Sequence, residues 1–355
     1  MAFTFATNPA IDGMAAQRIL APVIMRNVVQ KVQLSDGKGV TQEFSTDTSG
    51  LEIRIIRQTP LSQKARKLGA GTDGKHFSAQ SYEIPQSAEY GIKPDIVWDT
   101  PIDIPRVMTD MLPLDVLNAN ARNIDQAVAK NINASTLAAQ LAAALNYHYN
   151  DGTTAVTTHV VEHTLGTDSF LDSFFTLSAV LDNGDTDNGV DAFAITGRAI
   201  QLRPSVLADM RKSGQAVFDL GNWKGQDMLK VGAIEPEVTP NTHEDGYLGE
   251  INQTAFFVTA NAIWTLAEEY LGLDAGDLDG VYAVLSAAEG TGRAIAFGNS
   301  VQVIPSPIGQ GVRLLPLYRW GHNVFFPKSV AMLVEDSFAA VGDGALEVVA
   351  PGSQA

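Results

Sequence analysis

The longest regular pattern of apolar residues lies between Pro113 and Leu145. Apolar side chains recur there at intervals of three and four residues, the spacing of one helix face, at Leu114, Leu117, Ala121, Ile124 and Val128. A helix over the whole range would be about 50 Å long at ~1.5 Å per residue. Because the stripe is narrow, we expect a strut that packs against a sheet on one side, not the centre of a bundle. The polar run 133–135 is a place where this helix could break.

Shorter segments complete a mixed pattern of helices and strands. A second helix is expected at Thr167–Asn183, with Thr167 or Asp168 as its N-cap, and a short helix is expected after Pro204. Apolar runs bounded by turn residues predict strands at 51–60, 78–107, 191–204, 246–260, 280–288, 294–307, 309–321 and 322–336. The segments 294–307 and 309–321 are expected to pair around a turn of proline and glycine.

Two of the extended segments, 51–60 and 78–107, enclose a long polar stretch that is rich in glycine and positive charge. Strand signals on both sides of such a stretch predict a protruding β-hairpin. Its tip would carry Lys64, Arg66, Lys67 and Lys75. Loop tips of this kind are usually exposed and mobile, and they often carry function.

The same stretch contains a formal G-x-G-x-x-G at Gly69, Gly71 and Gly74, the spacing found in dinucleotide-binding loops. A nucleotide site of that type follows a buried strand and opens a helix. Here the glycines follow the polar sequence QKARKL and precede an extended segment that meets a proline. We therefore interpret them as part of the loop tip and not as a nucleotide site.

The composition is that of an ordinary globular chain, since 45% of the 355 residues are hydrophobic and 18% are charged. The absence of cysteine excludes disulfides, thiolate metal sites and cysteine nucleophiles. No apolar run approaches the ~18 residues of a membrane span. The first residues lack the charged start and apolar core of a signal peptide. We therefore expect a soluble protein made inside a cell.

The net charge of −16 is unevenly distributed. Residues 1–100 hold 11 Lys and Arg against 10 Asp and Glu, whereas residues 151–300 hold 7 against 22. Such acidity disfavours tight wrapping of nucleic acid, because phosphate binding depends on Lys and Arg. It is compatible with a surface that stands near nucleic acid without adhering to it.

Residues that could support catalysis or metal binding form no complete motif. His159 and His163 have H-x-x-x-H spacing, but their segment is β-branched and a third ligand is missing, which favours an exposed loop pair over a metal site. The acidic run from Asp182 to Asp191 is similar to a calcium loop but lacks the acidic twelfth position, which favours a solvated turn. No Walker, G-x-S-x-G or H-E-x-x-H motif occurs, so we expect neither enzymatic activity nor a cofactor.

The order of these parts, more than any single motif, resembles the major capsid proteins of tailed bacteriophages, which have the Hong Kong 97-type fold. The likeness extends from about Leu51 to Phe338. LEIRIIRQTP through DIVWDTPIDIP resembles the family's extended loop, and NARNIDQAVAKNI, with its Ile124-Asp125 pair, resembles the spine helix. AITGRAIQLRPSVLADM resembles the axial strand and helix, KVGAIEPEVTPNTHEDGYLGEINQTAFFVT the glycine-punctuated passage, and RLLPLYRWGHNVFFPKSVAML the closing strands.

The resemblance implies an α+β fold with an N-terminal arm, an extended β-loop, a peripheral domain with a spine helix, and an α/β axial domain. The core residues of the spine helix would be Leu117, Ala121, Ile124 and Val128. The implied parts are the N-terminal arm at 1–50, the extended loop at 51–100, the peripheral domain with the spine helix at 101–164, the axial domain at 165–292, the peripheral return strands at 293–321, and the axial closing strand with the C-terminal tail at 322–355.

The resemblance also implies a function, namely self-assembly of hexamers and pentamers into an icosahedral head shell that encloses double-stranded DNA with little specific binding. Assembly in the host bacterial cytoplasm would place the protein in the virion, with separate scaffolding, portal and decoration proteins as partners and no membrane. Candidate contacts with neighbouring subunits are Lys64, Arg66, Lys67 and Lys75. The alternatives are a nanocompartment shell protein of the same fold, a phage tail or baseplate protein, and a cytosolic α/β enzyme.

Two departures from the family add further expectations. No long, charged helical segment precedes the arm, so a built-in scaffolding segment is not expected. Some family members crosslink a loop lysine to an asparagine beside a glutamate. The corresponding region offers Asn299 and Asn323 but no Asp or Glu between Glu289 and Glu335, so no autocatalytic crosslink is expected.

Overall fold

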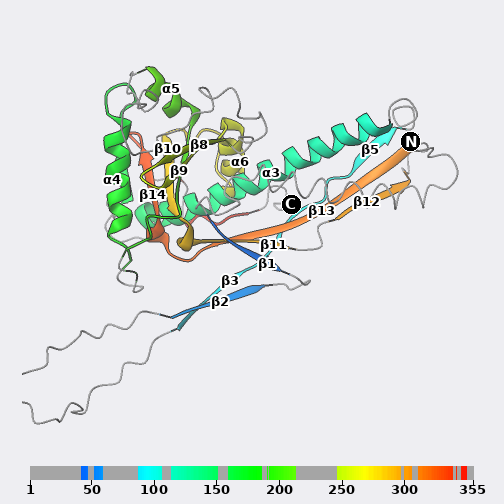
Figure 1. Cartoon of the computed structure of the whole chain (residues 1–355), viewed down its shortest axis with the longest axis horizontal. Helices are drawn as coiled ribbons and strands as arrows, with labels where there is room; N and C mark the ends of the chain where they lie inside the picture. The colour runs from blue at the N-terminus through cyan, green and yellow to red at the C-terminus, as the bar shows by residue number, and fades with distance from the viewer. Residues whose placement is uncertain are drawn as a thin grey trace, which may run out of the picture.

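The computed structural model shows two six-stranded sheets, a separate two-stranded hairpin and the helices α3, α4, α5 and α6 among its described residues (Figure 1). The structure describes residues 41–46, 52–58, 87–105, 113–150, 159–185, 190, 192–212, 246–296, 300–305, 311–338, 341 and 345–349. The mixed α and β pattern expected from the sequence is confirmed.

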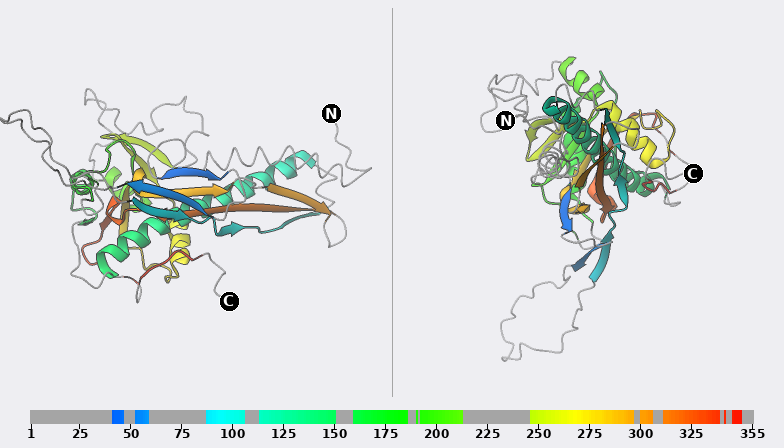
Figure 2. Two further views of the ribbon diagram at one scale, coloured as in Figure 1. Left: turned by 90° about the horizontal axis from the view of Figure 1, so that it is seen from below. Right: turned by 90° about the vertical axis from the view of Figure 1, so that its right-hand side faces the viewer.

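One sheet, here called the long sheet, runs beside α3 (Pro113–Leu145), the longest helix of the described chain (Figures 1 and 2). Its strands are β1 (Gln42–Thr46), β11 (Thr291–Ala296), β13 (Gly311–Val324) and β12 (Ser300–Pro305), with β4 (Ile96–Trp98) and β5 (Ile102–Pro105) also paired to β13. The expected antiparallel pairing of β12 with β13 is confirmed.

The alternation of side chains along β13 explains how this sheet meets the helix. Successive residues of a strand point to opposite faces. Leu314, Tyr318 and Trp320 are buried in the same hydrophobic core as α3, whereas Leu317 and Arg319 between them are exposed. One face of the long sheet is therefore covered by α3, and on the opposite face β13 exposes side chains at its Leu317 end, whereas Ala294 of β11 is buried there near Ile92 and Phe325.

The second sheet has the order β6 (Val160–Glu162), β14 (Val330–Val334), β10 (Val281–Ala287), β7 (Arg198–Leu202), β9 (Thr254–Val258) and β8 (Tyr247–Ile251). Along β14, Val330 and Met332 join the core formed with α3 and α6 (Asn261–Leu271), whereas Ala331 and Leu333 join the core that contains residues of α4 (Phe170–Asp182) and α5 (Pro204–Lys212). Both faces of β14 are covered, which explains its continuous apolar sequence.

The hairpin consists of β2 (Ile53–Gln58) and β3 (Ser87–Ile92), paired antiparallel from Ile53↔Ile92 to Gln58↔Ser87. It projects away from the rest of the molecule, as the right-hand view of Figure 2 shows. The predicted hairpin is therefore confirmed for its stem. Its predicted tip lies at 59–86, outside the described residues.

The range predicted for the long helix is confirmed, but its predicted environment is only half right. The helix continues through 133–135 because the Ser135 and Thr136 hydroxyls donate to the Ile132 carbonyl at 3.1 and 2.7 Å, which satisfies these buried polar groups. Every residue from Ile132 to Ala142 is buried, because α6 and the second sheet cover the faces that the long sheet leaves open. The prediction of a strut with a sheet on one side is wrong for this half of the helix.

The second helix begins later than predicted. The Asp168 carboxylate accepts from the Thr164 backbone at 2.7 Å and so closes the turn before the helix. Ser169 is the N-cap of α4, and its hydroxyl accepts from the Asp172 backbone. The predicted caps, Thr167 and Asp168, therefore belong to the preceding turn.

Three other segments differ from the prediction. Residues 246–260 form the hairpin β8–β9 and not one strand, because Asn252 and Gln253 take φ values of 50° and 61° in the connecting turn. The strand predicted at 191–204 is limited to β7. Helix α6 was not predicted at all.

Candidate functional site

The predicted spine-helix residues divide into two groups. Ile124 and Val128 are fully buried in the core between α3 and the long sheet. Leu117 and Ala121 lie on the same helix, but their side chains are outside the described residues. The basic residues predicted for subunit contacts also lie outside the described residues, as do the glycines of the tip: Lys64, Arg66, Lys67, Lys75, Gly69, Gly71 and Gly74.

The stem of the hairpin exposes an apolar side chain and a small ionic cluster. Ile56 is 69% exposed. Arg54 bonds to Glu89 across the two strands at 3.2 Å and to Glu52 at 3.4 Å. A two-stranded hairpin alone is at best marginally stable in water. This surface would therefore gain stability from contact with another protein surface.

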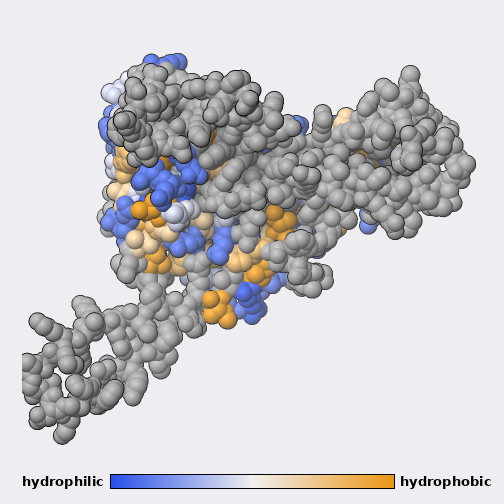
Figure 3. All heavy atoms as spheres, viewed as in Figure 1, coloured by the Kyte–Doolittle hydropathy of each residue, from blue (hydrophilic) through white to orange (hydrophobic). Residues whose placement is uncertain are grey.

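The base of the hairpin is held against the long sheet by close backbone contacts. Tyr90 packs against Phe325 with 5.2 Å between ring centroids, and the Asn323 amide donates to the Gly91 carbonyl at 2.7 Å. At Gly321 the passing chain is so close that a Cβ atom would overlap the Lys93 carbonyl. Figure 3 shows hydrophobic surface at this base. These contacts hold the base of the hairpin in one orientation relative to the long sheet.

On β4, β12 and β13, the face of the long sheet away from α3 carries partly exposed apolar side chains. Val97 is 41% exposed, and Leu317 and Ile304 are each 37% exposed. The pairing of Val97 with Arg319 and of Ile304 with Arg313 places all of them on the face away from α3. We call this surface, defined by Val97, Ile304, Arg313, Leu317 and Arg319, the outer face. Exposed apolar residues gathered on one sheet face indicate an interaction surface.

A salt bridge fixes the far end of the outer face. The Arg313 guanidinium makes two bonds to the Asp103 carboxylate, at 2.7 and 2.6 Å, between the paired strands β13 and β5. A bidentate pair of this kind fixes geometry more than it adds stability at a solvated site. It therefore supports the shape of the outer face.

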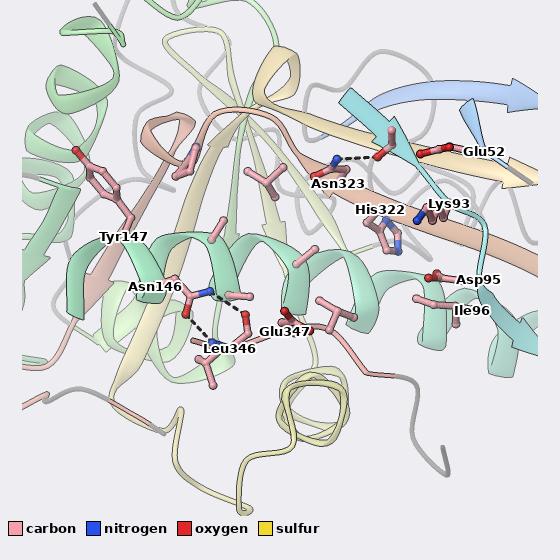
Figure 4. A pocket seen from close by; sticks show the side chains of 17 residues that line it. Glu52, Lys93, Asp95, Ile96, Asn146, Tyr147, His322, Asn323, Leu346 and Glu347 are labelled. Carbon is pink, nitrogen blue, oxygen red and sulfur yellow. Dashed lines mark hydrogen bonds between the residues drawn. The ribbon is translucent and has the colours of Figure 1, made fainter. Parts of the chain in front are cut away.

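An open cavity of about 790 Å³ lies between the hairpin base, α3 and the C-terminal segment (Figure 4). Its wall on α3 is made of small residues, including Ala139, Ala142 and Ala143. Asn146 holds the C-terminal segment in place by two hydrogen bonds with the Leu346 backbone, at 2.8 and 2.7 Å. These two hydrogen bonds therefore hold one wall of the cavity in place.

The lining of this cavity changes one argument made from the sequence. Asn323 has no acidic residue near it in sequence, but Glu52 and Asp95 line the same cavity, together with Lys93 (Figure 4). Separation along the chain is therefore no measure of the distance between Asn323 and a carboxylate. The expectation that no autocatalytic crosslink forms loses this support and stays untested.

Buried arginines connect the second sheet to the segments around it. Arg198 is fully buried and donates to the Ala194, Ser178 and Phe193 carbonyls, to the Ser178 hydroxyl and to the Asp182 carboxylate, at 2.6 to 3.2 Å. It thus ties the end of α4 to the segment before β7. In the sequence, Arg198 belongs only to the segment that resembles the family's axial strand and helix, and no local pattern indicates its partners on α4.

A second arginine joins α6 to the loop before β10. Arg203 donates to the Val281 and Leu278 carbonyls, each at 2.7 Å, and lies 4.4 Å from the Trp264 ring centroid. Burial lowers its pKa below the usual value, although Asp279 and then Glu268 act in the opposite direction. Arg203 therefore has a structural role in the interior of the fold.

The histidine pair does not occupy the predicted exposed loop. His159 and His163 are both buried, and they have different neighbours. His163 bonds to the Ser173 hydroxyl at 3.0 Å, and burial lowers its pKa, partly opposed by Asp168 and Asp209. His159 packs beside His148. No group of three or more His, Asp or Glu residues in the described part of the chain could hold a metal ion.

The acidic run is also less solvated than predicted. Asp185 is buried and forms an ion pair with Lys328 at 3.2 Å, and its backbone bonds to Val190. The residues between them, 186–189, lie outside the described residues.

Among the described helices none is long and apolar enough to cross a membrane.

Comparison with known proteins identifies the fold. No family model and no curated protein matches the sequence. Among solved structures, the capsid of the cyanophage P-SCSP1u matches with a TM-score of 0.52 and 14% identity over 85% of this chain and 90% of that chain. The capsid of Ralstonia phage GP4 gives 0.50 and 11% over 85% and 89%, and Microbacterium phage Oxtober96 gives 0.50 and 9% over 86% and 94%.

These structural similarities cover most of the chain and show its fold, although the sequence identities are only 9–14%. The chain has the α+β Hong Kong 97-type fold of phage capsid proteins, as its sequence resemblance implied.

Proposed function

We propose that this chain is the major capsid protein of a tailed phage and assembles with copies of itself into an icosahedral head shell around double-stranded DNA. The observation that carries this proposal is the capsid-type fold. The exposed hairpin stem and the outer face agree with it. Stable protein interfaces bury about 800 Å² on each partner, and an elongated subunit offers room for several of them.

The parts of the fold take the following roles in this proposal. The hairpin is the extended loop, α3 with the long sheet is the peripheral domain, and the second sheet with α4, α5 and α6 is the axial domain. The boundaries inferred from the sequence, at 51–100, 101–164, 165–292, 293–321 and 322–355, follow this division except that β4 belongs to the long sheet, β6 belongs to the second sheet, and β11 and β13 run across the boundaries at 292 and 321. The arm at 1–50 contains β1, which already pairs with β11 of the long sheet.

The partners follow from the same proposal. Further copies of the chain would form hexamers and pentamers, and any scaffolding, portal and decoration proteins would be separate chains. The acidity of residues 151–300 suits a wall that encloses DNA with little binding, because few cations are present to release the counterions of DNA. The finished protein would reside in the virion after assembly in the host cytoplasm.

Electron microscopy of the expressed full-length chain tests the proposal directly. We expect closed particles of uniform size in negative stain and fast sedimentation. A chain that stays monomeric over a wide range of concentration and salt would contradict the proposal. Closed shells that contain protein cargo would indicate a nanocompartment, and tubes or plates would indicate a tail or baseplate protein.

A further inference from the structure

Two buried histidines meet where α3 ends and the second sheet begins. His148 lies in the π-helical turn Asn146–Asn150 that follows α3, and His159 immediately precedes β6. Their ring centroids are 5.5 Å apart, and they are only 3% and 6% exposed. Tyr147 packs edge-on against both rings, at 5.2 and 5.8 Å. π-Helical turns are rare and often occur at functional positions.

The charged groups around this pair come from two other places in the fold. Lys328 lies in the short helical turn before β14, Asp185 follows α4, and they form an ion pair at 3.2 Å. Both act electrostatically on His159. The described elements that carry the pair, Asn146–Asn150 and β6, also hold Tyr147, Tyr149 and the exposed Glu162, whereas β14 is VAMLV and the buried face of α4 is Phe170, Ser173, Phe174, Leu177, Ser178 and Leu181.

The balance of charge in this cluster depends on the imidazoles. When the His159 ring is neutral, the described charges of Lys328 and Asp185 cancel one another. When it is protonated, two positive charges of the described residues face one carboxylate in a buried site, where charges interact more strongly than in water. Repulsion would then act between the turn after α3, β6 and the turn before β14. Protonation therefore weakens the contact that joins these three elements.

The pKa of His159 is shifted in the direction that disfavours protonation of the folded chain. Burial, then the neighbouring His148 and the charge of Lys328 lower it to about 4, against the opposing effects of the Lys328 backbone and Asp185. In an unfolded chain the pKa is ~6.5. Unfolding therefore takes up a proton between these two values. The stabilising effect of neutral His159 is complete above about pH 6.5 and is lost as the pH falls toward 4.

We propose that His159, packed against His148, forms an acid-sensitive latch between the end of α3 and β6, closed while the His159 ring is neutral and opened by its protonation. The latch is a property of the single subunit, so it does not depend on whether the chain forms a shell. Acid would loosen residues 146–150 and 159–162 before it loosens the buried strands β7 and β10.

Hydrogen exchange of the full-length chain at pH 7.5 and 4.5, corrected for the intrinsic rate, tests the latch. A single linked proton changes an opening equilibrium by up to ~10-fold per pH unit. We expect protection in 146–150 and 159–162 to fall by about tenfold or more at pH 4.5, while β7 and β10 stay protected. His159→Gln should remove most of this pH dependence. His163→Gln, a matched change of a buried histidine outside the latch, should retain it.

Two results would overturn the proposal. One is an equal loss of protection at pH 4.5 in wild type and His159→Gln. The other applies even where the variant does not fold: an NMR titration of the wild-type chain in which every imidazole titrates near pH 6.5 while the fold stays intact. Sedimentation of the same samples reports assembly separately, so failure of the latch and failure of shell formation are distinguishable.

Discussion

At the residue scale, Gly321 shows how a single missing side chain allows two parts of the chain to cross. A Cβ atom there would overlap the carbonyl of Lys93 and approach the Pro94 backbone. Backbone atoms cannot rotate away as the end of a side chain can. We expect Gly321→Ala to lower the free energy of unfolding by about 1–3 kcal/mol or more. Urea denaturation of the variant beside wild type measures this change.

Gly292 provides the matched control for that substitution. It lies on the neighbouring strand β11, and a Cβ there would meet the ring of Phe325 and the end of the Ile92 side chain. Side-chain ends can shift more easily than backbone, so Gly292→Ala should cost less than Gly321→Ala. An equal or larger cost at Gly292 would show that the crossing at Lys93 is not tightly packed.

These residue-scale constraints were largely invisible in the sequence. Gly321 and Lys93 are far apart in the chain, and nothing near either residue indicates that they meet. The same is true of Arg198, whose partners on α4 and before β7 become visible only in three dimensions. The burial of His159 and His163 was also missed, because their short β-branched segment gives no information about what covers it.

At the element scale, α3 could be predicted because its signals are local. Apolar spacing marked one face, and Pro113 suits the first turn of a helix. The burial of its second half depends on α6, which was missed. Helix α6 begins at Asn261, and its N-cap residue Ala260 provides no side-chain cap, so its start carries no signal. Its end does carry one, because Gly272 has a φ of 68° in the left-handed region.

Ile124 is the described residue through which the helix prediction can best be tested. It is fully buried in the core shared by α3 and the long sheet. Ile124→Asp would place a carboxylate in this contact, at an expected cost on the order of several kcal/mol. Thermal unfolding should show a lower midpoint near neutral pH, with partial recovery in acid as the carboxylate becomes neutral.

The neighbouring residue supplies the control. Asn123 is exposed on the same helix, so Asn123→Asp adds the same charge without burying it and should leave the midpoint nearly unchanged. A small effect of Ile124→Asp, no larger than that of Asn123→Asp, would mean that the helix face is assigned wrongly.

At the scale of the whole molecule, the order of the parts was predictable but the surfaces were not. Alternation and turn residues predicted the hairpin stem, and the resemblance supplied the fold. The outer face is completed by the pairing of β4 and β5 with β13, in which Asp103 and Arg313 are 210 residues apart in the chain. The cavity likewise needs α3, the hairpin base and the C-terminal segment together. No local pattern contains such information.

The final prediction concerns the charge that assembly must accommodate. Residues 1–100 are close to neutral overall, with a basic predicted tip, whereas residues 151–300 are strongly acidic. We expect Lys64, Arg66 and Lys67 to contact carboxylates of a neighbouring subunit. One exposed ion pair contributes only ~0–1 kcal/mol, so a single substitution should have little effect. A shell repeats the contact in every subunit, so reversing all three charges to Glu should block or misdirect assembly while the subunit stays folded.

Sedimentation and circular dichroism of this triple Glu variant beside wild type measure particle yield and folding separately. Two controls isolate the cause. Reversal of the exposed residues Lys93, Lys130 and Lys212 changes the net charge equally, and Gln at 64, 66 and 67 removes attraction without adding repulsion. Salt screens such contacts over ~8–10 Å, so the deficit of the Gln variant should shrink as salt rises. Normal shells from the Glu variant would show that apolar and backbone contacts hold the hairpin, because its positive charge would then be dispensable.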